Sequence, residues 1–323
     1  MGRSSFSLKP VKISVIGLGY GGSCAVTCMV RDGIEGVETI AMDTDTCALA
    51  IAEASTRVLF GEGLFHGFGT NGNDRGSLKA AGECRGGIRE VIDGAEMVFI
   101  VAGMGGGAGT GSAPVVAEVA KECGALTIAI VTKPFGFEGE RCKAIAENGI
   151  KTLLPLVDTT ITIPNDKLFT SYGQKLDYDK AFRRVNEVVV DGVQAITRLI
   201  TVPGMINLDL PAIGAVIKSA GPARMSIGIG SGQDRATNAA KAALASPLLD
   251  VPLSLVRGAF FNVSGCDNLT LPEISQATEI IKQAVDPNAK IKFGSVPDSR
   301  TNTDIKVTLI VTGFETASIQ THS

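Results

Sequence analysis

Continuous apolar runs separated by helical patterns fill the first half of the chain. The runs that predict buried strands lie at residues 11–17, 37–43, 97–102, 126–132 and 159–163. Between them, the spacing of apolar positions predicts helices over residues 21–32 and 113–123 and from near residue 138. Strands that are apolar throughout and alternate with helices are typical of a parallel sheet covered on both faces. The pattern therefore predicts a Rossmann-like α/β domain.

The pattern changes after residue 175. Apolar residues recur at helical spacing from Leu176 to Ile200, and Pro203-Gly204 ends the stretch, so we predict one long central helix. Beyond it, strand-like runs at 222–230, 257–264, 289–294 and 305–313 alternate with helical patterns at 233–245 and 271–285. The predicted organisation is a first α/β domain over residues 1–175, the central helix over 176–202, a smaller α/β domain with a mixed sheet over 203–315, and a short tail over 316–323.

Composition limits the classes of protein that fit this pattern. The chain has 323 residues, of which 45% are hydrophobic and 20% charged, so it can bury a sizeable core. No apolar run is long enough to span a bilayer, and the N-terminus has no secretory signal. A net charge of -3 without a basic block argues against a nucleic-acid surface. Seven scattered cysteines without a CxxC pair fit a reducing compartment. We therefore expect a cytoplasmic protein that neither inserts directly into a membrane nor binds nucleic acid.

A glycine-rich segment follows the apolar run at 97–102. In GMGGGAGTG, residues 103–111, six of nine positions are glycine. Backbone N–H groups with no Cβ nearby can close on an anion, and the dipole of the helix that follows favours negative charge. A flexible linker is not normally placed between a buried strand and a helix start. The segment therefore predicts a phosphate cradle.

A second glycine motif, GxGxxG at Gly17–Gly22, follows the first predicted strand, and Asp43 ends the next. Alone, this combination is a dinucleotide-binding fingerprint and favours an NAD-dependent oxidoreductase, although a tight strand-to-helix turn gives the same motif. A dehydrogenase needs one pyrophosphate loop, and a chain with two histidines has little material for histidine-based catalysis. Two anion cradles at one sheet edge suit a nucleoside triphosphate, and the chain has no GxxxxGK[ST] P-loop.

The segment Gly103–Pro114, GMGGGAGTGSAP, resembles the signature loop of the tubulin superfamily in its FtsZ form. Further segments are similar to FtsZ motifs in the same order along the chain: VTKPFGFEG at 131–139, ITIPNDKL at 161–168, NLD at 207–209, SPLL at 246–249 and VTG at 311–313. The resemblance covers about residues 11–315. It implies a GTPase domain, a central helix and a C-terminal activation domain.

The same resemblance implies a function and a set of partners. The bound nucleotide would be GTP or GDP, with Mg²⁺ carried by the phosphates and no protein residue assigned as a metal ligand. Protomers would polymerise head to tail into cytoskeletal filaments, since a heterologous contact that does not close produces a filament. GTP would be hydrolysed at the contact between protomers. The expected role is in cell division (septation), and the partners would be further copies of the chain and division-complex proteins.

The resemblance also assigns the nucleotide contacts. Those at the phosphates come from two glycine-rich segments and one loop: Gly19, Tyr20, Gly21, Gly22, Ser23 and Cys24; Gly103, Gly105, Gly106, Gly107, Ala108, Gly109, Thr110 and Gly111; and Gly69, Asn71 and Gly72, which would close near the γ-phosphate. Glu138 would contact the ribose. Asn165 and Asn186 would contact guanine, whose mixed edge suits an amide, and Phe182 would stack on the base. Without the resemblance, Phe182 fits core packing and Asn165 a turn.

Hydrolysis needs a water molecule directed at the γ-phosphate. The resemblance implies that the neighbouring protomer supplies acids from the loop after the central helix, where Asp209 would polarise the water and Asn207 would orient it. Asp209 also suits the N-cap of a following helix, with Pro211 in its first turn, and the two roles are compatible.

Several positions depart from the family pattern, all of them at the proposed nucleotide site. Ala212 stands where the family usually has a second acid, and Cys142 where it has an arginine that reaches the phosphates. Cys24 and Asp43 each replace an asparagine, and Tyr20 replaces a glycine. Alanine can neither ligate a cation nor accept a proton. We therefore expect a divergent member that binds GTP or GDP and hydrolyses GTP slowly. The alternative is a paralogue that binds nucleotide and scaffolds filaments without appreciable hydrolysis.

Overall fold

The computed structural model describes residues 11–172, 177–266, 268–301 and 303–314. The predicted start of the central helix at Leu176 and the predicted tail at 316–323 lie outside these ranges. Within them, no helix combines the length and the apolar character that a membrane crossing requires.

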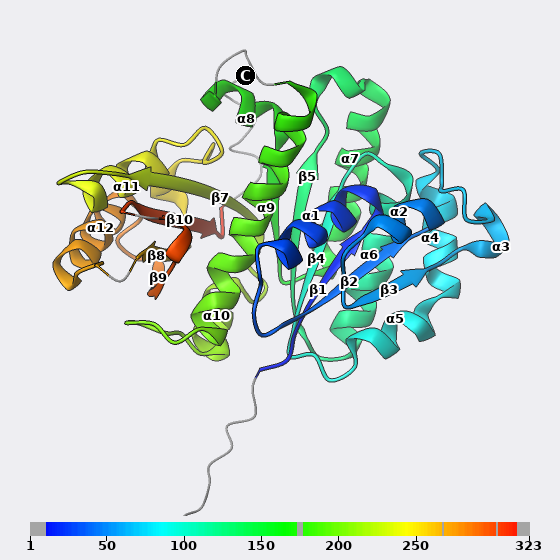
Figure 1. Ribbon diagram of the computed structural model, residues 1–323, viewed down its shortest axis with the longest axis horizontal. Coiled ribbons are helices and arrows are strands. Elements are labelled where there is room, and N and C mark those ends of the chain that lie inside the picture. Colours follow the sequence, from blue (N-terminus) through cyan, green and yellow to red (C-terminus); the bar gives the residue numbers. More distant parts are fainter. Residues whose placement is uncertain (1–10, 173–176, 267, 302, 315–323) are drawn as a thin grey trace, which may run out of the picture.

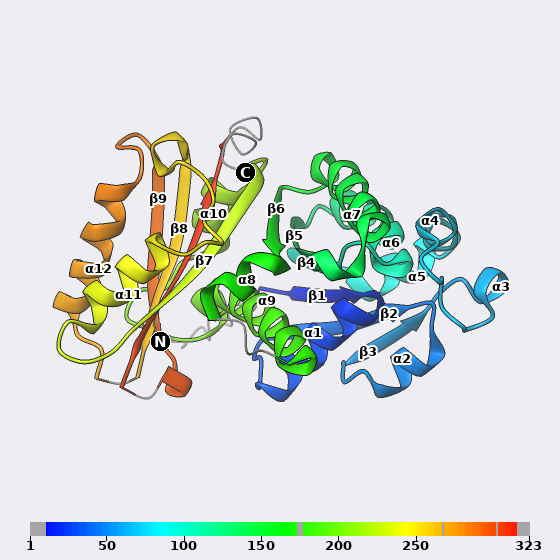
Figure 2. The same ribbon diagram turned by 90° about the horizontal axis from the view of Figure 1, so that it is seen from above.

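A single ten-stranded sheet runs through the molecule in the order β3-β2-β1-β4-β5-β6-β7-β10-β8-β9 (Figures 1 and 2). Its first six strands are parallel: β3 (Thr56–Leu59), β2 (Val37–Asp43), β1 (Ile13–Leu18), β4 (Met97–Gly103), β5 (Leu126–Lys133) and β6 (Thr159–Pro164). The others are β7 (Gly221–Gly230), β10 (Ile305–Thr312), β8 (Gly258–Gly265) and β9 (Lys290–Pro297). β10 is antiparallel to β7 and β8, whereas β7 joins β6 and β9 joins β8 in parallel. The predicted parallel sheet and mixed sheet are thus confirmed, and they form one continuous sheet.

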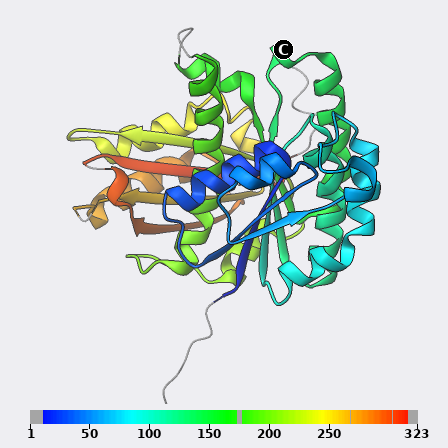
Figure 3. The same cartoon turned by 45° about the vertical axis from the view of Figure 1, so that its right-hand side comes forward.

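Helices cover both faces of the parallel part of the sheet. Consecutive residues of a strand point to opposite faces. Phe99 of β4 accordingly packs in a cluster with α1 (Gly19–Arg31) and α9 (Tyr178–Thr201), whereas Ile100 packs with the helices on the other face. Those helices are α4 (Asp74–Glu83), α5 (Arg85–Ile92), α6 (Gly107–Glu122) and α7 (Glu140–Leu153). Figures 1 and 3 show α1 (blue) beside α9 (green).

The central helix α9 lies between the parallel part of the sheet and the C-terminal strands (Figure 2). Its apolar face, which includes Val185, Val189 and Ile196, is buried in the same cluster as Phe99. A Cβ at Gly192 would lie 2.8 Å from Met225 Sδ of β7, so glycine lets the helix approach the sheet there. Behind the C-terminal strands, α11 (Arg235–Leu244) and α12 (Leu271–Ala284) bury a separate apolar cluster.

A buried ion cluster connects α1, α9 and the C-terminal strands. The carboxylate of Asp298, 2% exposed, is surrounded by three cations: Arg300 at 2.9 Å, Lys306 at 3.2 Å and Arg198 at 3.4 Å. Lys306 also pairs with Asp191 of α9 at 2.8 Å, and Arg300 with Asp32 at the end of α1 at 3.3 Å. Burial raises the pKa of Asp298, but the hydrogen bonds from Arg300 and the charges of the other cations outweigh it and hold the pKa well below its usual range.

The glycine-rich segment differs from the coil that its composition predicts. Helix α6 begins at Gly107, not near residue 113, so Gly107, Gly109 and Gly111 are helical. A Cβ at Gly111 would lie 2.1 Å from the carbonyl oxygen of Asp74, and one at Gly107 would lie 2.2 Å from Thr70 Oγ1. Glycine is therefore required here because α4 and the preceding loop pack directly against the first turns of α6, despite its poor helix propensity.

Several short elements are absent from the sequence-based prediction. They are β3, α2 (Thr46–Ile51), α3 (Glu62–Phe65) within the predicted loop at 61–76, and α8 (Asn165–Tyr172) directly after β6. Each is too short for its periodicity to be recognised, and the two longer of these helices begin at polar residues that also signal turns.

Candidate nucleotide-binding site

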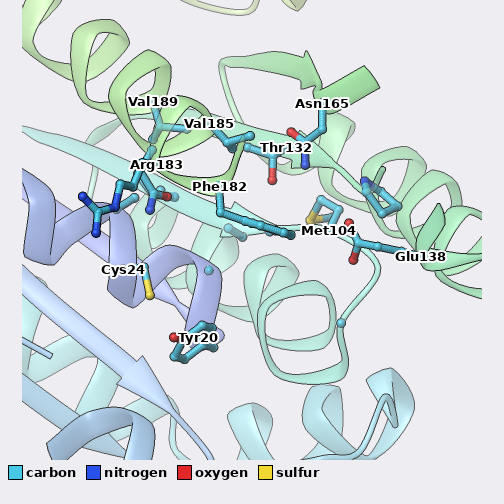
Figure 4. A pocket seen from close by; sticks show the side chains of 18 of the residues that line it. Tyr20, Cys24, Met104, Thr132, Glu138, Asn165, Phe182, Arg183, Val185 and Val189 are labelled. Atoms are coloured by element: carbon cyan, nitrogen blue, oxygen red, sulfur yellow. The ribbon is translucent and has the colours of Figure 1, made fainter. Parts of the chain in front are cut away.

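A cavity of about 670 Å³ lies at the carboxyl ends of the parallel strands, bordered by α1, the start of α6 and the first half of α9 (Figure 4). It adjoins β1 and β4, where the strand order changes direction from 3-2-1 to 4-5-6. Open parallel sheets bind ligands at this point, where the loops after two neighbouring strands diverge. The volume is in the range of small-molecule and cofactor sites.

The two glycine motifs meet at this cavity. Gly19, which begins α1, adopts a left-handed conformation with φ +66°, and a Cβ on it would lie 2.8 Å from Gly109 N. Gly21 and Gly103 also face each other, since a Cβ on Gly21 would lie 3.5 Å from Gly103 Cα. The approach of Gly19 to Gly109 requires glycine, because a Cβ there would clash and the left-handed conformation disfavours other residues.

Two helix N-termini border the cavity without a side-chain cap. Leu18 precedes α1 and Gly106 precedes α6, and neither has a side chain that accepts a hydrogen bond from an N–H of the first turn. The first N–H groups of a helix have no intrahelical partner, and the helix dipole places partial positive charge there. The hydroxyl oxygen of Thr110, in the first turn of α6, accepts the N–H of Gly105 at 2.9 Å and so fixes the preceding loop. Together these termini can hold an anion such as a phosphate chain.

The opposite wall of the cavity carries aromatic and amide side chains (Figure 4). The ring of Phe182 on α9 is held edge-on by Phe135, with centroids 5.2 Å apart. Asn165, at the start of α8, is 4% exposed, and its Oδ1 accepts no hydrogen bond from the described residues. A buried acceptor without a partner is costly, so this atom is available for a donor on a ligand. Glu138 also lines the cavity, with one oxygen accepting the N–H of Phe135 at 2.8 Å.

The structure brings many of the predicted contact residues to the cavity wall: Tyr20, Gly21, Cys24, Gly103, Gly106, Glu138, Asn165, Phe182 and Asn186. Other predicted positions lie behind that wall. Gly22 packs against β4, where a Cβ would lie 2.4 Å from Val101 O, and Ser23 is 2% exposed. The loop with Gly69, Asn71 and Gly72 packs, through Thr70, on the first turn of α6. The carbonyl oxygen of Cys142 would lie 2.9 Å from a Cβ on Gly105, so this cysteine borders the same loop.

Sequence reasoning missed two charged residues of the wall, Asp179 and Arg183. They share a face of α9 with Phe182 and Asn186, since residues three or four positions apart on a helix are neighbours. The helical spacing from Phe182 and Asn186 was therefore sufficient to predict that Asp179 and Arg183 face the same site. Among the described residues, no group of His, Cys, Asp and Glu side chains is arranged to hold a metal ion.

Asp43 ends β2 beside the start of α1 and is 3% exposed. Its Oδ1 accepts the N–H groups of Thr44 at 2.7 Å and Asp45 at 3.3 Å. Burial raises the pKa of Asp43, and these hydrogen bonds offset the effect only in part. Burial likewise raises the pKa of the Cys24 thiol, a smaller part of the increase coming from the charge of Asp43. Cys24 is therefore a neutral thiol at neutral pH, and it is hydrogen-bonded to the side chain of Tyr20.

We expect Asp43→Asn to stabilise the protein at neutral pH and to have little effect in acid. A raised carboxyl pKa means that ionisation costs more in the folded chain than in the unfolded one, so wild-type stability falls as pH rises from the ordinary aspartate pKa through the raised value. Urea unfolding across this pH range measures the difference, with Asp93→Asn as the control at an exposed carboxylate. A difference between the Asp43→Asn protein and wild type that does not grow with pH would contradict the assignment.

The loop after the central helix lies at the other end of α9 from the cavity. Asp209 is the N-cap of α10 (Leu210–Ile217) and accepts the N–H of Ala212 at 2.9 Å, so the predicted capping role is confirmed. Both N–H bonds of the Asn207 amide are used, to the carbonyl oxygens of Leu199 at 3.0 Å and Val202 at 2.7 Å. Its Oδ1 also accepts the N–H of Gly204 at 2.8 Å, so the side chain fixes the shape of the loop; the orienting role toward a water molecule stays a prediction.

Helix α9 has 24 residues, so its two ends are roughly 36 Å apart at 1.5 Å per residue. The cavity is lined by positions from 179 to 189, and the loop follows Thr201. Asp209 therefore cannot reach the cavity of its own protomer.

Comparisons with known proteins agree with this architecture. The sequence matches the Tubulin/FtsZ family, GTPase domain, over residues 12–173 and the FtsZ family, C-terminal domain, over residues 221–315. An FtsZ dimer from M. jannaschii is 38% identical, with a TM-score of 0.92 over 95% of this chain and 89% of that one. CetZ1 from Haloferax volcanii, a GDP-bound monomer, is similar in fold alone, at 20% identity and a TM-score of 0.80 over 94% of this chain and 95% of that one. The chain therefore belongs to the tubulin/FtsZ family of GTPases.

Proposed function

We propose that this protein binds GTP and GDP in the cavity and polymerises head to tail into filaments that hydrolyse GTP slowly. One observation carries the proposal. The N-termini of α1 and α6, which have no side-chain cap, meet through two glycine loops at one end of the cavity, and aromatic and amide side chains form the wall at the opposite end. A nucleoside triphosphate matches that polarity, with its phosphates at the helix N-termini and its base at α9.

The base end of the cavity supports guanine as the ligand. Phe182 offers a ring for stacking, and the unpartnered Oδ1 of Asn165 is an acceptor for the N–H groups of the guanine Watson–Crick edge. Asn186 adds a second amide one helical turn beyond Phe182. Glu138 also lines the cavity, and we propose that it contacts the ribose. Mg²⁺ would arrive with the triphosphate, because it retains water and needs few protein ligands.

Hydrolysis would take place between protomers. Asp209 and the cavity lie at opposite ends of α9, so a head-to-tail contact is what would bring Asp209 of one copy to the nucleotide of the next. The carboxylate oxygen of Asp209 that does not cap α10 could then polarise the attacking water. Ala212 offers no second acid, and Cys142 no cation, which is why we expect slow turnover.

Two alternative functions can be compared with slow GTP hydrolysis in filaments. A protein that scaffolds filaments without appreciable hydrolysis differs only in the rate at the interface, and Ala212 favours it. An NAD-dependent oxidoreductase has lost its support, since the GxGxxG motif belongs to a tubulin/FtsZ GTPase domain here. A role in cell division within the cytoplasm is the biological setting that we propose for the filament.

Two measurements test the proposal. Nucleotide released from the purified, denatured protein should be GDP or GTP; release of NAD or of no nucleotide, together with failure to bind added GTP, would refute it. Light scattering and phosphate release should then be recorded against protein concentration with GTP and Mg²⁺. Scattering that appears above a critical concentration, with slow phosphate release that begins at the same concentration, supports hydrolysis at the contact. Scattering without phosphate release supports the alternative function, a filament scaffold without appreciable hydrolysis.

A further inference from the structure

Arg183 is the one basic side chain among the described residues that line the cavity, where Glu138 and Asp179 are the acidic ones. It is exposed, and it makes no hydrogen bond or ion pair with the described part of the chain. Arg184, its neighbour, behaves differently, because its guanidinium pairs with Glu187 at 2.6 Å. Arg183 thus presents five N–H donors to the cavity mouth with no protein acceptor assigned to them.

The described residues of α1 that line the cavity include no charged donor. Cys24 of α1 lines the cavity there, but a neutral thiol is a weak donor and this one is bonded to Tyr20. Figure 4 shows the Arg183 side chain extending from α9 across the helix that carries Cys24. Arg183 on α9 and Asn165 at the start of α8 both line the cavity with Phe182. A base stacked on Phe182 would therefore have a guanidinium and an amide acceptor in the wall around it.

Guanine has edges that match this pair of groups. Its Watson–Crick edge has N–H donors, and its neighbouring edge presents O6 and N7 as two acceptors in one plane. Adenine presents an N–H donor in place of O6, which a guanidinium cannot accept. We propose that Arg183 is a specificity-determining residue that donates to O6 and N7 of the bound guanine. The inference rests on the proposed function, since it assumes that the cavity is the nucleotide site.

The test compares equilibrium binding of GDP, ADP and 7-deaza-GDP, which lacks the N7 acceptor, to four proteins: wild type, Arg183→Ala, Arg183→Lys and Arg184→Ala. Arg184→Ala is the matched control, one position along the same helix, and circular dichroism verifies that each variant is folded. We expect Arg183→Ala to weaken GDP binding roughly tenfold to a hundredfold and to leave ADP binding unchanged. Arg183→Lys should not restore discrimination, because a lysine lacks the planar fork. 7-Deaza-GDP should bind wild type more weakly than GDP does, and should bind the Arg183→Ala protein as well as GDP does.

Three results would overturn the inference. Equal losses for GDP and ADP in Arg183→Ala would mean a phosphate contact, and equal losses in Arg183→Ala and Arg184→Ala would mean a general effect of charge. Unchanged GDP binding in Arg183→Ala would leave Arg183 without a role at the base. Failure of the wild-type protein to bind GDP at all would instead refute the proposed function, and with it the premise of this inference.

Discussion

Replacing Ala212 by Asp is expected to raise GTP turnover in the assembled protein by roughly tenfold to a hundredfold, since a positioned carboxylate contributes about this much or more to proton transfer. The site can accept the change. Ala212 is half-buried in the first turn of α10, where an acid interacts favourably with the helix dipole. Its backbone N–H, which donates to Asp209 at 2.9 Å, is retained. The substitution therefore adds an acid beside Asp209 without disturbing the cap.

The measurement is phosphate release per protomer at protein concentrations where light scattering shows equal assembly. Ala215→Asp is the matched control, because Ala215 is exposed on the same helix one turn further on and about 4.5 Å away along the axis. We expect that control to turn over at the wild-type rate. If the Ala212→Asp protein assembles normally and its turnover does not rise above that of the control, the missing second acid is not what limits hydrolysis.

The sequence predicts the parallel strands well because a strand buried on both faces has to be apolar throughout. The runs around Ile16 and Ile100 show this, since their neighbours Val15 and Phe99 are equally buried on the opposite face. The sequence also predicts the Asp209 cap, which is a local interaction between residues three positions apart. Where the physical cause lies within a few residues, the pattern of the chain reveals it.

Other features depend on contacts between distant parts of the chain, and these escape a reading of the sequence. Gly111 lies within α6 despite its poor helix propensity, and glycine is required there because α4 packs against it. The part that Asn207 plays in shaping its loop depends on carbonyl groups at the end of α9, to which its amide donates. In each case the deciding partner comes from a different element.

The ion cluster around Asp298 is the clearest example of such a long-range feature. One of its pairs, between Arg300 and Asp32, connects residues 268 positions apart in the chain. The cluster also connects α1, which begins at the nucleotide cavity, to the strands that follow the central helix. It therefore contributes to holding the C-terminal strands in place against α9.

Asp298→Ala is expected to cost about 3–5 kcal/mol of the free energy of unfolding, because it removes the buried carboxylate shared by three cations, two of them half-buried. Asp298→Asn, which keeps the shape of the side chain and removes its charge, should cost less. The folded-state pKa of Asp298 is depressed, so its contribution is complete above the ordinary aspartate pKa of about 3.9 and is lost as pH falls below it. The stability difference between wild type and Asp298→Ala should accordingly shrink in acid.

Urea unfolding of both variants at neutral and acid pH measures these differences, and Glu53→Ala supplies the comparison with an ion pair in solvent. Glu53 pairs with Arg31 at 2.6 Å, shorter than the pairs around Asp298, but both side chains are exposed. Exposed pairs contribute little to stability, because solvent screens them and ordering two long side chains costs entropy. Burial rather than pair distance should therefore decide the loss. Equal costs for Asp298→Ala and Glu53→Ala would show that solvent reaches the cluster and that apolar packing alone holds the C-terminal strands against α9.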